Sequence, residues 1–204
     1  MTQSTSPLLR VRNLTKRFPG VLALNRVDLE LYEGEFLSLI GENGAGKSTL
    51  MKILAGVQLP DEGEVRVAGN TVGLDSVKIA QSQGIALIHQ ELNLSENLTV
   101  GANIFLGREP QRFGIINKPT IAKESKRFLA MVGLSLDPTT MTADLSIGQQ
   151  QLVEIARALS VNARILIMDE PTSSLSAGET ETLFDVIREL RSHGVSIIYI
   201  SHRL

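Results

Sequence analysis

The chain has 204 residues, 43% of them hydrophobic, which is enough for one substantial globular core. A formal net charge of −2 argues against a nucleic-acid or anionic-membrane partner that is bound through bulk charge. The absence of cysteine excludes disulfides, thiolate catalysis and zinc–thiolate sites, and it fits a reducing cytosol.

Short β-branched or apolar runs predict strands, in chain order, at residues 8–14, 27–31, 36–40, 64–67, 85–88, 165–168 and 196–200. The last three are nearly continuous apolar runs, as in strands buried on both faces of a parallel sheet. Between two of them, apolar residues repeat at helical spacing over 177–192, and Gly194 supplies a stop. Strands connected in this way predict an α/β fold.

The composition changes between about residues 95 and 145, where strand-like runs disappear and polar helical stretches replace them. One such stretch, 121–132, carries Phe128, Leu129 and Val132 on one side. We interpret this region as a helical lobe inserted into a single domain that spans residues 1–204. The sequence contains no internal repeat, so a second copy of the domain is not expected within the chain.

A glycine-rich segment follows the predicted strand at 36–40: residues 41–48 read Gly-Glu-Asn-Gly-Ala-Gly-Lys-Ser and lead into a predicted helix at 47–55. Glycines let backbone N–H groups turn toward an anion, and the helix N-terminus adds its dipole. Lys47 reaches the β- and γ-phosphates of a nucleotide, and Ser48 can ligate Mg²⁺. A chance glycine-rich turn is the simpler alternative. We predict a nucleotide site at Gly41, Asn43, Gly44, Ala45, Gly46, Lys47, Ser48 and Thr49.

Two carboxylates, Asp169 and Glu170, end the apolar run at 165–168. Ligands of open α/β sheets bind outside the carboxyl ends of the strands. Asp169 is therefore predicted to hold Mg²⁺, and Glu170 to position or deprotonate an attacking water. Alone, the pair would more simply be a surface Asp-Glu before the turn at Pro171, but the upstream phosphate loop favours the catalytic interpretation.

The segment 145–151, Leu-Ser-Ile-Gly-Gln-Gln-Gln, resembles the signature segment of the ATP-binding subunit of ABC transporters, and the order of motifs also fits that family. The resemblance covers nearly the whole chain. It implies a P-loop NTPase fold with a mostly parallel central sheet, an N-terminal antiparallel β portion and the helical lobe. It also implies that Phe18 stacks on adenine, Gln90 contacts Mg²⁺ and water, and His202 faces the γ-phosphate. Taken singly, these three would be a packing residue, a solvated polar residue and a surface histidine.

Ser146 and Gly148 open a helix and present a hydroxyl and free N–H groups at its positive end, with Gln149 beside them. In the family that this segment resembles, the signature of one domain closes over the nucleotide of another. The resemblance therefore implies an ATPase that is active only in a head-to-tail pair with a second ABC ATP-binding domain. An ordinary Ser146 N-cap is the structural alternative, and it is compatible with this role.

Finer features resemble the N-terminal half of carbohydrate-import ATPases of the ribose, xylose and galactose type. They are Ile147 and Ser176, where many family members have Gly and Asp, and the segments 41–52 and 89–92. The resemblance implies ATP-driven import of a small sugar, with a transmembrane permease and a separate periplasmic or extracellular sugar-binding protein as partners. No apolar run approaches the roughly 18 residues that span a bilayer. We therefore expect a peripheral protein at the cytoplasmic face of the membrane, with no nucleic-acid partner.

The family continues beyond the position of Leu204, so the sequence is interpreted as an incomplete domain. Missing strands would leave an unpaired sheet edge, and the isolated chain is therefore expected to be poorly stable or to aggregate. Two alternatives remain open. One is a non-transport ABC ATPase of ribosomes or DNA, which the absence of basic tracts disfavours. The other is a truncated remnant that binds ATP without hydrolysing it.

Overall fold

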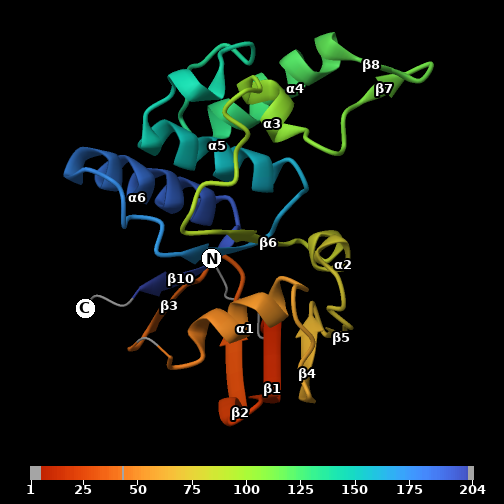
Figure 1. The fold of residues 1–204 in the computed structure, drawn as a ribbon, viewed down its shortest axis with the longest axis vertical. Helices are drawn as coiled ribbons and strands as arrows, with labels where there is room; N and C mark the ends of the chain where they lie inside the picture. Colours follow the sequence, from red (N-terminus) through yellow and green to blue (C-terminus); the bar gives the residue numbers. More distant parts are fainter. Residues whose placement is uncertain (1–5, 43, 202–204) are drawn as a thin grey trace. The chain divides into compact units, whose positions relative to one another are not determined.

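A computed structural model describes residues 6–42 and 44–201, which form two compact units (Figure 1). Of the described residues, the first unit contains those up to Leu87, then Ala163–Glu170 and those from Leu190 to Ser201. The second contains Ile88–Asn162 and Pro171–Glu189, so it includes the whole of the predicted helical lobe. The single-domain description stays a prediction. Among the described residues, no helix is long and apolar enough to cross a membrane.

An antiparallel sheet in the first unit consists of β1 (Leu9–Phe18), β2 (Val21–Leu31), β4 (Glu62–Val67) and β5 (Asn70–Thr71), in the order β2-β1-β4-β5. Strands β1 and β2 are longer than the sequence predicted. Their apolar alternation stops near Leu14, but backbone pairing continues to Phe18 opposite Val21. In the extension, apolar Val21 and Leu22 are exposed while polar Thr15 is buried, and the pairing register shifts, so the hydrophobic pattern does not mark it.

A second sheet has the order β3-β10-β9-β6, from β3 (Phe36–Ile40), β10 (Ser196–Ser201), β9 (Ile165–Asp169) and β6 (Ile85–Ile88). Strand β10 pairs in parallel with β3 on one side and with β9 on the other. The apolar residues of β9 are completely buried, as their unbroken run predicted. The predicted α/β class, with a parallel sheet and an N-terminal antiparallel portion, is confirmed.

The first unit also has two helices, α1 (Lys47–Leu54) and α2 (Val77–Ser82). Apolar residues of α1 join a core with residues of β1, β2, β9 and β10. Figure 1 shows α1 beside β1 and β2. This packing fixes the start of α1, and with it the glycine-rich loop, against the strands.

The second unit is mainly helical, with α3 (Val100–Ile104), α4 (Lys118–Met131), a short 3₁₀ turn (Thr142–Asp144), α5 (Ile147–Leu159) and α6 (Ala177–Ser192) as far as Glu189. Buried Asn103 ties two loops to α3: it accepts a hydrogen bond from the N–H of Ser95 at 2.8 Å and donates to the hydroxyl of Thr142 at 2.8 Å. These bonds satisfy a polar side chain that would otherwise be costly to bury.

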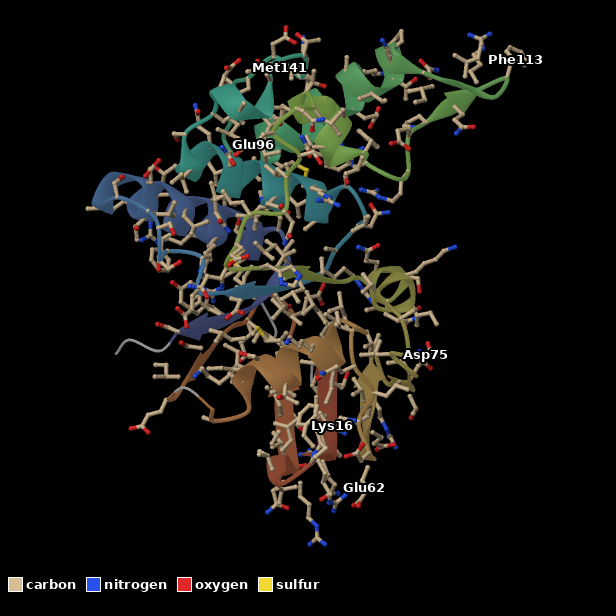
Figure 2. All side chains as sticks on the ribbon, in the orientation of Figure 1. Lys16, Glu62, Asp75, Glu96, Phe113 and Met141 are labelled. Atoms are coloured by element: carbon tan, nitrogen blue, oxygen red, sulfur yellow. The ribbon has the colours of Figure 1, made fainter. Side chains whose placement is uncertain are left out.

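A β-hairpin interrupts this helical region, which corrects the expectation that residues 95–145 contain no strands. Strands β7 (Gln111–Arg112) and β8 (Ile115–Ile116) are joined by a two-residue turn, and Phe113 lies at its tip (Figure 2). Phe113 and Gly114 both have positive φ, as a type I′ turn requires. Strands of two residues are too short to produce a periodic signal, so the sequence pattern missed them.

Candidate functional site

Two glycines of the loop between β3 and α1 have a left-handed backbone conformation. Gly44 and Gly46 have φ of +84° and +85°, in the left-handed region that favours glycine. A Cβ on Gly44 would meet no atom of the described residues within 4 Å, whereas a Cβ on Gly46 would clash with the carbonyl oxygen of Ala23. Gly46 directly precedes α1, whose first N–H groups have no intrahelical acceptor. The loop therefore leads into an anion-binding helix end.

Lys47 folds back over this loop. Its ammonium donates to the carbonyl oxygen of Glu42 at 2.8 Å and to that of Gly41. The N–H of Ala45 also donates to the Glu42 carbonyl, at 3.2 Å, which closes the turn. A cation that donates to neutral carbonyl groups can exchange them for a phosphate oxygen, with which it forms a stronger charge-assisted bond.

The predicted carboxylate pair lies at the end of β9. Asp169 is its last residue and pairs in register with Ile200 of β10. Glu170 follows with φ of +45°, and its N–H donates to the carbonyl oxygen of Ile200 at 3.0 Å. A non-glycine residue in the left-handed region is strained, and such residues cluster at functional sites. The sequence predicted the position of Glu170, but nothing in it signals this conformation.

The strand order brings the phosphate loop and the carboxylate pair to one edge of the sheet. Strands β3 and β9 lie on either side of β10, with Ile40 opposite Ser201 and Asp169 opposite Ile200. Because all three run parallel, Gly41 and Glu170 leave the sheet at the same carboxyl edge. The predicted site residues Asn43 and His202 lie outside the described residues.

Phe18 lies at the end of β1, before the turn at Pro19 and Gly20. Its side chain is 37% exposed, and the neighbouring side chains of Val21 and Leu22 are also exposed. The Lys16 ammonium lies 5.7 Å from the centre of the Phe18 ring. Phe18 is thus a partly exposed surface residue, and its stacking on adenine stays a prediction.

The signature segment begins helix α5 in the second unit. Ser146 is the N-cap: its hydroxyl accepts a hydrogen bond from the N–H of Gln149 at 3.2 Å. In return, the Gln149 side chain accepts from the N–H of Ser146 at 3.0 Å, which completes a capping box. The predicted N-cap is confirmed, and the roles of Ser146, Gly148 and Gln149 toward a nucleotide remain predictions.

Glu179 of α6 was missed by the sequence interpretation. One of its oxygens accepts hydrogen bonds from the Ser146 hydroxyl at 3.0 Å and the Gly148 N–H at 3.1 Å. The other accepts from the Ser176 N–H at 3.0 Å and hydroxyl at 2.8 Å. These bonds, first those from Ser176, lower the pKa of Glu179 to about 2. The Ser-x-x-Glu spacing at 176–179 could have indicated the contact with Ser176, but not the contacts with α5.

Gln90 lines a pocket of about 380 Å³ in the second unit. The pocket also contains Ile147 and Gln151 from the signature segment, together with residues of the turn after the carboxylate pair: Pro171, Ser173, Ser174 and Leu175. Gln151 is 3% exposed, and its amide nitrogen has no hydrogen-bond partner among the described residues. The structure therefore brings Gln90 to the signature segment, which the sequence pattern did not predict.

A phosphate loop between a strand and a helix, with two carboxylates at the same edge of a parallel sheet, defines the class of P-loop nucleotide-binding proteins. Within this class, the chain belongs to the ABC transporter family, whose profile matches residues 24–173.

Curated relatives are similar over almost the whole chain. A putative ribose/galactose/methyl galactoside import ATP-binding protein of Burkholderia cenocepacia is 54% identical over 202 residues, which are 99% of this chain and 39% of that protein. The ribose import ATP-binding protein RbsA of Rhodopirellula baltica is 54% identical over 205 residues, 100% of this chain and 40% of that protein. The resemblance to carbohydrate-import ATP-binding proteins is confirmed, and the chain spans about two fifths of their length.

Solved structures agree on the fold. The ADP conformation of MJ1267, an ATP-binding cassette of an ABC transporter, matches with a TM-score of 0.85 and 28% identity over 98% of this chain and 83% of that one. A dimeric post-hydrolysis state of the cassette MJ0796, bound to ADP and Pi, matches with a TM-score of 0.78 and 29% identity, covering 96% and 88% of the two chains. These likenesses extend the predicted P-loop NTPase fold to nearly the entire chain.

Proposed function

We propose that this chain binds ATP and, when paired head-to-tail with a second such domain, hydrolyses it to energise the import of a small sugar. The observation that carries the proposal is the common sheet edge of the phosphate loop and the pair Asp169–Glu170. Membership of the ABC transporter family supports the nucleotide. The names of the curated relatives support the sugar.

In this proposal the loop N–H groups and Lys47 bind the phosphates, and Phe18 stacks on the adenine. Ser48, which is exposed, and Asp169 offer hydroxyl and carboxylate oxygens, the hard donors that suit Mg²⁺. Bound there, Mg²⁺ would neutralise charge on the phosphates. A role for Gln90 toward the metal rests on the family resemblance alone, as do the roles of Asn43 and His202.

Glu170 is the general base of the proposed hydrolysis, because it is the carboxylate next to the metal-binding position. The hydrogen bond from its N–H to Ile200 fixes its backbone at the sheet edge. A carboxylate whose backbone is fixed needs little reorganisation to orient water. It accepts a proton from the water that attacks the γ-phosphate.

Pairing supplies the remaining donors, since the Ser146 end of α5 acts on the nucleotide of the other domain. The dimeric state of the similar cassette MJ0796 supports this arrangement. A transmembrane permease and an extracellular or periplasmic sugar-binding protein complete the proposed assembly, which places the chain at the cytoplasmic face of the membrane.

Nucleotide binding and phosphate release of three variants test the proposal. Lys47→Ala should weaken MgATP binding at least about tenfold, because it removes the cation that faces the phosphates. Glu170→Gln should keep binding and reduce hydrolysis about 10²-fold or more, as expected for loss of a general base. Lys52→Ala, at an exposed position of α1, is the matched control and should change neither. Hydrolysis that survives Glu170→Gln would contradict the base assignment.

The sugar is tested separately, by uptake of radiolabelled ribose and galactose in cells that carry Glu170→Gln in the native gene. Uptake of at least one sugar should fall to background. Unchanged uptake of both, with hydrolysis abolished in vitro, would contradict sugar import and favour a non-transport ATPase.

A further inference from the structure

A carboxylate of the chain itself occupies the end of α5 at which a phosphate is expected. One oxygen of Glu179 takes two donors, the Ser146 hydroxyl at 3.0 Å and the Gly148 N–H at 3.1 Å. All three residues belong to the second unit, so these contacts lie within one compact part of the molecule. The bound group is a negatively charged oxygen, the chemical equivalent of a phosphate oxygen at a helix N-terminus.

These donors cannot form full-strength hydrogen bonds to two acceptors at once. A serine hydroxyl and a backbone N–H each carry one hydrogen. The Ser146 hydroxyl also accepts from Gln149, so its own hydrogen remains directed to Glu179. A phosphate oxygen that approaches Ser146 and Gly148 must therefore replace the Glu179 oxygen.

The negative charges of Glu179 and of a phosphate also require that the phosphate oxygen replace the Glu179 oxygen. The four hydrogen bonds to Glu179 keep its pKa near 2, so the carboxylate is ionised at neutral pH. A carboxylate and a nucleotide phosphate that share one pair of donors would repel each other at short range. Contact is also tight: a Cβ on Gly148 would lie 2.6 Å from the Glu179 oxygen. Little space remains for a second anion while Glu179 is in place.

We propose that Glu179 is an internal substitute for the phosphate at the signature end of α5, and that pairing with a nucleotide-loaded partner displaces it. The inference rests on the proposed function. The second Glu179 oxygen accepts from Ser176 in a capping box of α6, and this anchor remains while the first oxygen leaves. Glu179 thus disfavours pairing with a partner domain unless that domain presents a group that binds the start of α5 as strongly as a nucleotide phosphate does.

Nucleotide-driven self-association measures the displacement directly. The chain is loaded with Mg²⁺ and a non-hydrolysable ATP analogue, and its association constant is obtained by sedimentation velocity. Glu179→Gln should tighten association on the order of tenfold, since a neutral amide competes less well for charge-assisted bonds. Glu179→Asp, which keeps the charge but is one methylene shorter, should also tighten it. Glu181→Gln is the matched control, because it removes the same charge from an exposed position of α6.

The ¹⁵N–¹H resonance of Gly148 monitors the contact itself. It should shift in Glu179→Gln without nucleotide and remain unchanged in Glu181→Gln. If Glu179 only holds α5 and α6 together, its substitution should leave the association constant unchanged or lower it. That result in both Glu179 variants would contradict this inference and leave the proposed function standing. A parent chain that binds the analogue and never associates overturns the proposed pairing, and this inference with it.

Discussion

Helices α1 and α5 both begin at segments predicted to bind phosphate, but the atoms at the two helix starts have different internal partners. Before α1, left-handed Gly46 provides no side-chain cap, and the Lys47 ammonium rests on backbone carbonyl groups. At α5, the extended residue Ser146 caps the helix with its side chain, and the donors there hold the Glu179 carboxylate. Phosphate must therefore compete with neutral acceptors for the cation at α1 and with an anion for the donors at α5.

The comparison predicts that the start of α1 requires glycine for two reasons, the left-handed backbone and the lack of room for a Cβ. Gly46→Ala should lower the free energy of unfolding by about 2–5 kcal/mol, the sum of left-handed strain and overpacking against Ala23. Gly44→Ala should cost only about 1–2 kcal/mol, because its φ is positive but its surroundings are open. Urea denaturation provides both values. Equal losses would show that the contact with Ala23 does not matter.

At the start of α5, by contrast, the requirement for glycine should depend on a single side chain. Gly148 does not have the left-handed φ of Gly46, and the atoms that a Cβ would meet belong to Glu179. Gly148→Ala should therefore destabilise the parent chain. In a Glu179→Ala background the same change should stabilise it, by up to about 1 kcal/mol from helix propensity. A double-mutant cycle in urea measures the reversal, and the same sign in both backgrounds would contradict it.

Prediction from sequence succeeded where side-chain burial or a special backbone conformation produces a local pattern of residue types. The run at Ile165–Asp169 is buried on both faces, so its apolar residues mark the strand almost to the residue. The glycine spacing of 41–48 marks the phosphate loop because each special conformation needs a special residue type. The hairpin at 111–116 left no such pattern, since its side chains are exposed and its strands are short.

The missed part of the site has a different cause. Glu179 is 33 positions from Ser146 along the chain, and only the packing of α6 against the start of α5 brings the two together. Its local role, capping α6 with Ser176, is visible in the sequence and gives no hint of a second role. Likewise, Glu170 combines a left-handed backbone with a hydrogen bond from its N–H to the neighbouring strand β10, and sequence spacing encodes neither feature.

Glu179, whose carboxylate contacts the start of α5, should also make the free energy of unfolding depend on pH. This is the smallest of the expected effects. The pKa of Glu179 is about 2 in the folded chain, below its ordinary value of 4.5. The unfolded chain therefore binds this proton first as the pH falls, which favours unfolding. The contribution of Glu179 is fully present above pH 4.5 and is lost as the pH approaches 2. Urea midpoints at pH 5 and pH 3 should fall less for Glu179→Gln than for the parent chain. Glu181→Gln should follow the parent, and an equal fall in all three proteins would contradict this prediction.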